Sequence, residues 1–209
     1  MRQVHGNPRM RVLHASPDAP PLDLRVAGEG TVLTVAYGQV SDYLPLSPGG
    51  HRVRAFPTGA PGPGGELFVT VLPELEPGRD YTLLLLGRLA SLHPSLILDS
   101  TPPPGPDRAR VRILHASADA PPLDVGIADD PLWRPNVSFG QVTQWAEVPA
   151  GTVDVVLRRA GSDQVLATLS YYTLNPGRLY TFAVLGLVAG TPGFMVMPLV
   201  EEVEMRLPA

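Results

Sequence analysis

Residues 11–23 read Arg-Val-Leu-His-Ala-Ser-Pro-Asp-Ala-Pro-Pro-Leu-Asp, and residues 112–124 read Arg-Ile-Leu-His-Ala-Ser-Ala-Asp-Ala-Pro-Pro-Leu-Asp. The second stretch differs from the first only at Val12 and Pro17, which become Ile113 and Ala118. A recurrence of this length at a spacing of about 100 residues is typical of a duplicated domain. The sequence therefore predicts two similar units in tandem, each opened by the same strand and turn.

The rest of the chain supports the same division. Residues 75–87 match residues 174–186, both around a Pro-Gly-Arg turn that leads into an apolar run. A length of 209 residues suits two domains of ordinary size. We predict a first domain over 9–100 and a second over 109–207. Residues 101–108 are rich in proline and predict a stiff linker of polyproline character.

The apolar pattern along each half indicates strands. Leu22, Leu24 and Val26 alternate with Asp23 and Arg25, which is the period of a half-buried strand. Short strands at regular spacing with turn residues between them predict that each unit is an all-β antiparallel sandwich or barrel.

Residues 83–86 and 182–185 are apolar on both faces and indicate strands that are covered on both sides. The cover of the outer face could be a long loop, the neighbouring unit or a second chain.

Composition excludes several classes of function. The net charge of −4 and the lack of long basic runs argue against nucleic acid and anionic membrane as partners. Without cysteine there can be no disulfide and no thiolate site. All 16 basic residues are arginine, which indicates either a GC-rich genome or selection for stability, as in a thermophile. Residues 1–8 lack the features of a secretory signal.

One uncharged segment is long enough to suggest a membrane span. It covers residues 179–200, but its counterpart in the first half carries Arg88 and Asp99, and turn formers interrupt both copies. Two strands and a turn explain both copies, so we predict no membrane span.

The quoted phrases resemble a known family. The opening motif at residues 11–20, Tyr-Gly-Gln-Val at 37–40 and Pro-Gly-Arg-Asp-Tyr-Thr at 77–82 are similar to the bacterial and archaeal domain-of-unknown-function family 4397. The resemblance implies immunoglobulin-like sandwiches, often in tandem and often in exported or cell-surface proteins. It implies no enzymatic activity and no catalytic residues.

Three polar positions recur around the shared turn and are the candidate site residues. Asp at the turn can bind backbone amides while His packs beside it, which would make the turn scaffolding. Alternatively, one His and two carboxylates could hold zinc or another transition ion. The candidate ligands are His14, Asp18, Asp23, His115, Asp119 and Asp124.

The functional predictions follow from these alternatives. Because the chain has no Gly-x-Ser-x-Gly, His-Glu-x-x-His or phosphate-loop motif, we expect a non-enzymatic module without a cofactor. It would be a structural, adhesion or interaction protein of the cell envelope or exterior, with a protein partner or self-association. The alternative is a metal- or small-ligand-binding protein that uses the shared turn. A third class, a hydrolase, would require a Ser, a His and an acid to be brought together from distant loops.

Overall fold

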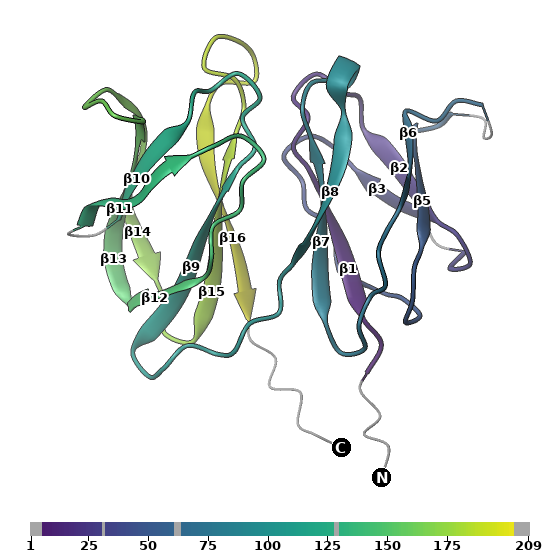
Figure 1. Cartoon of the computed structure of the whole chain (residues 1–209), viewed down its shortest axis with the longest axis horizontal. Coiled ribbons are helices and arrows are strands. Elements are labelled where there is room, and N and C mark those ends of the chain that lie inside the picture. Colours follow the sequence, from purple (N-terminus) through teal and green to yellow (C-terminus); the bar gives the residue numbers. More distant parts are fainter. Residues whose placement is uncertain (1–5, 31, 61–63, 128–129, 203–209) are drawn as a thin grey trace. The chain divides into compact units, whose positions relative to one another are not determined.

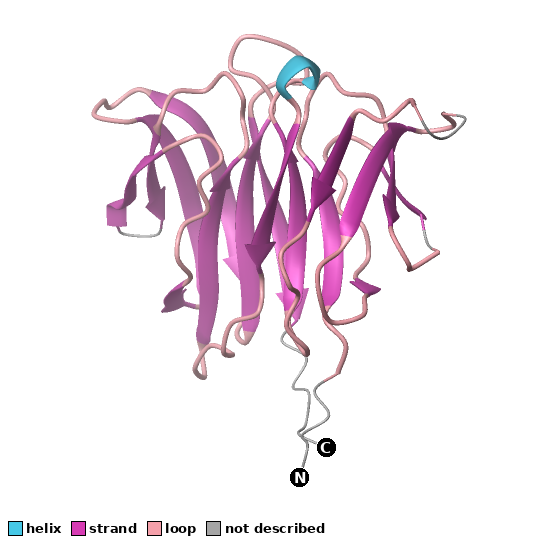
Figure 2. Cartoon of the chain, turned by 45° about the vertical axis from the view of Figure 1, so that its right-hand side comes forward, coloured by secondary structure: helices cyan, strands magenta, loops and turns pink. Residues whose placement is uncertain are grey.

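The computed structural model describes residues 6–30, 32–60, 64–127 and 130–202, and it is built almost entirely of strands (Figures 1 and 2). Within these residues the helical structure is one 3-10 turn, Leu89–Ser91. The all-β prediction is confirmed. The chain divides into two compact units, with the described residues up to Ser100 in one and those from Thr101 onward in the other.

Within the described residues, each unit contains eight strands. Those of the first unit are β1 (Arg9–His14), β2 (Leu22–Val26), β3 (Val32–Val35), β4 (Leu44–Pro45), β5 (Arg52–Pro57), β6 (Phe68–Val71), β7 (Asp80–Leu86) and β8 (His93–Leu98). Those of the second unit are β9 (Arg108–His115), β10 (Leu123–Ile127), β11 (Asp130–Val137), β12 (Ala146–Pro149), β13 (Gly151–Arg159), β14 (Val165–Leu174), β15 (Arg178–Leu185) and β16 (Met195–Glu202). The predicted domain end at residue 207 lies outside the described residues.

The strands of each unit form two four-stranded sheets in the same order. The first unit has sheets β4-β1-β7-β8 and β3-β2-β5-β6, and the second has β12-β9-β15-β16 and β11-β10-β13-β14. Each unit is therefore a sandwich-like domain, as predicted. Its immunoglobulin-like character stays a prediction.

One pair of strands in each unit departs from the antiparallel expectation. β1 lies parallel to β7, from Arg9 opposite Asp80 to His14 opposite Leu85. β9 and β15 repeat this arrangement, while the other pairs of named strands are antiparallel. A parallel pair cannot be joined by a tight hairpin, so its two strands lie far apart in the sequence.

The burial of side chains follows the predicted alternation. Leu22, Leu24 and Val26 of β2 are buried, whereas Arg25 is exposed. Together with residues of β1, β5 and β7 these three form the core of the first unit, and the second unit has an equivalent cluster.

The central strands are buried along both faces, as their apolar runs predict. In β7, Leu83 and Leu85 belong to the core cluster, and the alternating Leu84 and Leu86 are also buried. The same holds for β15.

The uncharged segment forms strands. Residues 179–185 lie in β15 and residues 195–200 in the antiparallel strand β16. Across the part of the chain that the structure describes, no helix is long and apolar enough to cross a membrane.

The domain division predicts that each half folds without the other, because each has its own core and its own pair of sheets. We expect fragments 1–100 and 101–209 each to give the circular dichroism of a β protein and to unfold cooperatively in urea. A fragment that stays unfolded, while the whole chain is folded in the same buffer, would contradict the division.

Candidate functional site

The repeated turn lies where the first strand of each unit ends. β1 ends at His14, and the chain turns at Pro17 and Asp18 before it enters β2 in the other sheet. The second unit makes the same connection after β9, with Ala118 and Asp119 in the turn. We call residues 14–20 and 115–121 the corners. Each corner carries the chain from one sheet of the sandwich to the other.

The histidine rings are buried inside the corners. The Nε2–H of His14 donates to the carbonyl oxygen of Pro20 at 3.0 Å, and the backbone N–H of Ser16 donates to Nδ1 at 3.3 Å. His115 repeats the first bond with Pro121 at 3.1 Å. With Nδ1 as acceptor and Nε2 as donor, the ring of His14 is neutral. Burial lowers the pKa of both imidazoles, although the backbone hydrogen bonds partly oppose this shift.

An aromatic ring stands edge-on to each histidine. The ring centroids are 6.4 Å apart for His14 and Tyr37, and 6.2 Å apart for His115 and Phe139. Both aromatic residues begin the repeated Gly-Gln-Val segments. The histidines are therefore packed as core side chains, each with its Nε2 hydrogen-bonded to a backbone carbonyl oxygen.

The turn carboxylates bind backbone amides about 70 residues further along the chain. Asp18 Oδ1 accepts a hydrogen bond of 2.7 Å from the backbone N–H of Leu89. The Asp119 carboxylate accepts two, from Val188 at 2.8 Å and from Ala189 at 3.1 Å. These amides lie in the loops that follow β7 and β15. Each turn carboxylate thus joins the corner to the loop at the same end of the sheet, since β1 and β9 run parallel to β7 and β15.

A glycine stands directly after β7 and directly after β15, at the start of each loop that a turn carboxylate binds. Gly87 follows β7 with φ +88° and Gly186 follows β15 with φ +80°. A Cβ at Gly87 would lie 2.7 Å from the carbonyl oxygen of Ser91, and one at Gly186 would collide with the backbone of Gly193. The loops that the carboxylates bind therefore require glycine both for its positive φ and for its lack of a side chain.

The second pair of carboxylates ties different loops. The Asp23 carboxylate accepts hydrogen bonds from the hydroxyls of Thr34 and Thr58 and from the N–H of Gly59, at 2.8, 3.1 and 3.3 Å. The Thr34 bond is the main reason why the pKa of Asp23 lies below its usual value. Asp23 thus joins β2 to β3 and to the loop after β5.

Asp124 has the same role in the second unit. Its carboxylate accepts from the backbone N–H groups of Asn136 and Gly161, both at 2.8 Å. The hydroxyl donors of the first unit are replaced by a main-chain donor, but the loops that are joined are equivalent.

The candidate residues consequently serve separate loops. His14 is hydrogen-bonded within its corner, Asp18 binds the loop after β7, and Asp23 binds the loop after β5. In residues 6–30, 32–60, 64–127 and 130–202 there is no group of three or more His, Asp or Glu side chains that could hold a metal ion. The metal hypothesis therefore has no ligand cluster in the described structure.

A buried arginine next to the corner escaped the sequence analysis. Arg11 Nε donates to the Thr82 hydroxyl at 2.9 Å and lies 3.8 Å from Asp99 Oδ2. Both Thr82 and Tyr43 donate to the same carboxylate oxygen of Asp99, and the Arg11 guanidinium lies 4.7 Å from the centre of the Tyr43 ring. A buried cation needs such partners to offset its loss of hydration.

The second unit keeps this arginine with a changed aromatic partner. Arg112 Nε donates to the Thr181 hydroxyl at 2.9 Å, and the guanidinium lies 4.2 Å from the centre of the Trp145 ring. The signal in the sequence was the repeated Arg that opens residues 11–23 and 112–124. The acid beside Arg11 could not be found from sequence spacing, because Asp99 lies 88 residues from Arg11.

The two hydrogen bonds that the Asp119 carboxylate accepts predict a measurable loss of stability when Asp119 is replaced. We expect Asp119→Ala to lower the free energy of unfolding by about 1–2 kcal/mol, because two backbone amides lose their acceptor as in the removal of a helix cap. Asp163→Ala, at an exposed loop position, is the matched control and should change stability by less than about 0.5 kcal/mol. Equal urea midpoints for both variants would show that the tie contributes nothing.

The buried histidines predict a pH dependence. Their folded pKa values are lowered, so protons bind the unfolded chain more readily, and stability is lost as the pH falls below about 6.5. We expect the urea midpoint to decrease from pH 7.5 to pH 5.5, and to decrease less in the His14→Gln/His115→Gln protein. His93→Gln changes an exposed histidine and should keep the slope of the parent protein. An unchanged slope in the double variant would disprove the assignment.

Comparison with solved structures gives distant matches. A candidate cell adhesion protein from Bacteroides uniformis is 10% identical, with 93% of this chain and 97% of that chain covered and a TM-score of 0.30. A candidate cell adhesion protein from Bacteroides ovatus is 9% identical over 95% and 98% of the two chains, with a TM-score of 0.25. The TIE protein of Bacillus anthracis is 11% identical over 86% of this chain and 33% of its own, with a TM-score of 0.27. Scores this low establish neither a shared fold nor a function.

Comparison with known families is more informative. No curated protein matches the chain. The model of the family described as domain of unknown function DUF4397 matches twice, over residues 8–126 and over residues 111–203. The matches overlap and together include both corners. The chain belongs to the DUF4397 family.

Proposed function

We propose that the protein is a non-enzymatic interaction module of the cell envelope or exterior, which acts in adhesion or assembly through its surface. One observation carries the proposal. In both units the repeated carboxylates, Asp18 and Asp23 in the first and Asp119 and Asp124 in the second, are hydrogen-bonded to groups of their own unit. Residues used in this way maintain the shape of the domain, and the exposed residues are then the ones that contact partners.

An exposed tyrosine supports a role in binding a protein partner. Tyr171 in β14 is 84% exposed, and its backbone lies in the left-handed region with φ +55°. The Asp154 carboxylate accepts a hydrogen bond of 2.7 Å from its N–H, at an irregularity in the pairing of β13 with β14. Non-glycine residues rarely adopt such a φ, and bulges of this kind redirect a side chain. Tyrosine is enriched at the centres of protein interfaces.

The location of β14 fits this role. β14 is the last strand in its sheet, next to β13 alone, so one edge of it is not paired within the sheet. Val165 on the same strand is also exposed, at 51%. An exposed aromatic side chain beside an open strand edge can dock a partner through both side-chain and main-chain contacts.

The experiment measures location and adhesion together. Fractionation of the source cells with an antibody against the protein should find it in the envelope or the medium, and beads coated with the protein should bind intact source cells. We expect Tyr171→Ala to reduce bead binding severalfold, because an interface aromatic side chain contributes about 1–2 kcal/mol or more. Val71→Ala, at a position 67% exposed on β6, is the control.

Three results would contradict the proposal. They are recovery in the cytosolic fraction, bead binding no greater than that of denatured protein, and equal binding by both variants. Loss of bead binding or a lower melting temperature in EDTA would instead favour the metal-binding alternative.

A further inference from the structure

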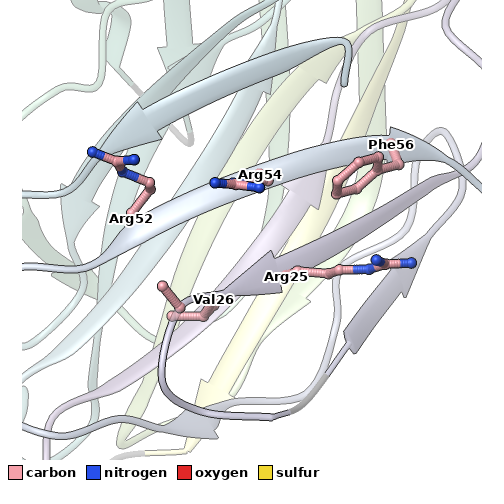
Figure 3. A pocket seen from close by; sticks show the side chains of 6 residues that line it. Arg25, Val26, Arg52, Arg54 and Phe56 are labelled. Carbon is pink, nitrogen blue, oxygen red and sulfur yellow. The ribbon is translucent and has the colours of Figure 1, made fainter. Parts of the chain in front are cut away.

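A basic hollow lies on the outer face of the sheet β3-β2-β5-β6 in the first unit (Figure 3). Its volume is about 240 Å³. Three arginine side chains from the paired strands β2 and β5 surround it, together with one aromatic ring. The lining residues are Arg25, Val26, Ala27, Arg52, Arg54 and Phe56.

The register of the strands places like charges opposite one another. Arg25 of β2 is the direct partner of Arg54 in β5, and Arg52 lies two residues before Arg54 on the same face, about 7 Å along the strand. Like charges in directly opposite positions destabilise a sheet. An arrangement that costs stability, and that the fold does not require, indicates a site for a ligand of opposite charge.

The acidic groups near the hollow offset only part of this charge. Arg54 Nη1 lies 3.7 Å from Glu66 Oε1, so the three arginines and Glu66 together carry a charge of +2. Asp23 lies opposite Phe56 in the register, and its carboxylate interacts electrostatically with Arg25, so that including Asp23 the charge at the hollow is +1.

The surroundings of two of these guanidinium groups differ. The Arg25 guanidinium lies 4.7 Å from the centre of the Phe56 ring, which restricts its orientation. Arg52 is exposed and, within the described residues, has no hydrogen bond or ion pair from its side chain.

The second unit shows that the sandwich does not need these arginines. In the strand registers, Asp124 lies opposite Arg158 as Asp23 lies opposite Phe56, which aligns β10 with β2 and β13 with β5. The positions of Arg25, Arg52 and Arg54 are then occupied by Gly126, Asp154 and Val156. The duplicate has the same sheet with a glycine, an acid and an aliphatic residue in the three places. The three arginines at these positions are therefore specific to the first unit.

We propose that this hollow binds a phosphate dianion, either inorganic phosphate or the phosphate group of a monoester. A phosphate group carries a charge close to −2 at pH 7, opposite in sign to the net positive charge at the site. Guanidinium groups bind phosphate oxygens in pairs of hydrogen bonds. The volume suits one anionic group rather than a larger ligand. The inference does not depend on the adhesion role, since purified protein is sufficient to test it.

The test is calorimetric titration of the full chain at pH 7.5 with inorganic phosphate, with glucose 6-phosphate and with glucose. We expect both phosphates to bind with a dissociation constant of about 1 mM or tighter, and glucose to show no binding. If the ester binds more tightly than inorganic phosphate, the natural source is an ester; if inorganic phosphate binds more tightly, it is the free ion. Arg52→Gln should weaken binding about tenfold or more, because charged hydrogen bonds are lost.

Two controls make the result specific. Arg79→Gln removes an arginine outside the hollow, whose side chain is 49% exposed, and should bind phosphate like the parent protein. Sulfate keeps its charge of −2 at pH 5.5, whereas phosphate loses most of its second charge. Binding of phosphate should therefore weaken more than that of sulfate when the pH is lowered from 7.5 to 5.5.

Several outcomes would overturn the proposal. One is the absence of measurable binding by either phosphate. Equal affinity in the Arg52→Gln and parent proteins would show that the hollow does not bind phosphate. An equal loss in Arg52→Gln and Arg79→Gln would show a general charge effect. A retained melting curve for Arg52→Gln excludes unfolding as the cause of lost binding.

Discussion

The parallel contact of the first strand with the seventh is the constraint on which each unit depends. β1 and β7 are separated by five strands of both sheets, so closing the sandwich requires the ends of a long segment to meet at a loss of chain entropy. The corner residues oppose this loss at the end of the contact, where Asp18 and Asp119 bind the loops that follow β7 and β15. The repeated turn carboxylates, Asp18 and Asp119, thus stabilise the closed sandwich.

Much of this fold could be predicted from local patterns. The alternation of Leu22, Leu24 and Val26 and the unbroken apolar run at residues 83–86 reflect which faces are buried, and burial is what such patterns report. The direction in which β1 meets β7 could not be predicted in this way. Pairing between strands about 70 residues apart leaves no periodic trace, and neither does the contact of Arg11 with Asp99.

The candidate site was predicted by residue type but not by role. The sequence identified His14, Asp18 and Asp23, yet a carboxylate that binds a metal and one that binds backbone amides look the same in a sequence. The three arginines of the hollow were less visible still, since Arg25 alternates with core residues as any solvated residue would. Only the register that sets Arg25 against Arg54 distinguishes the site. Residues common to both units maintain the sandwich, and residues found in one unit, such as Tyr171 and Arg52, are the ones for which we propose functions.

The central claim is that the turn carboxylates hold the loops after β7 and β15. Amide hydrogen exchange observed by NMR tests it most directly. The account predicts that the amides of Leu89, Val188 and Ala189 exchange slowly, and that Asp119→Ala accelerates exchange at Val188 and Ala189 without affecting Leu89. Fast exchange at all three amides in the parent protein, or rates unchanged by the substitution, would contradict it.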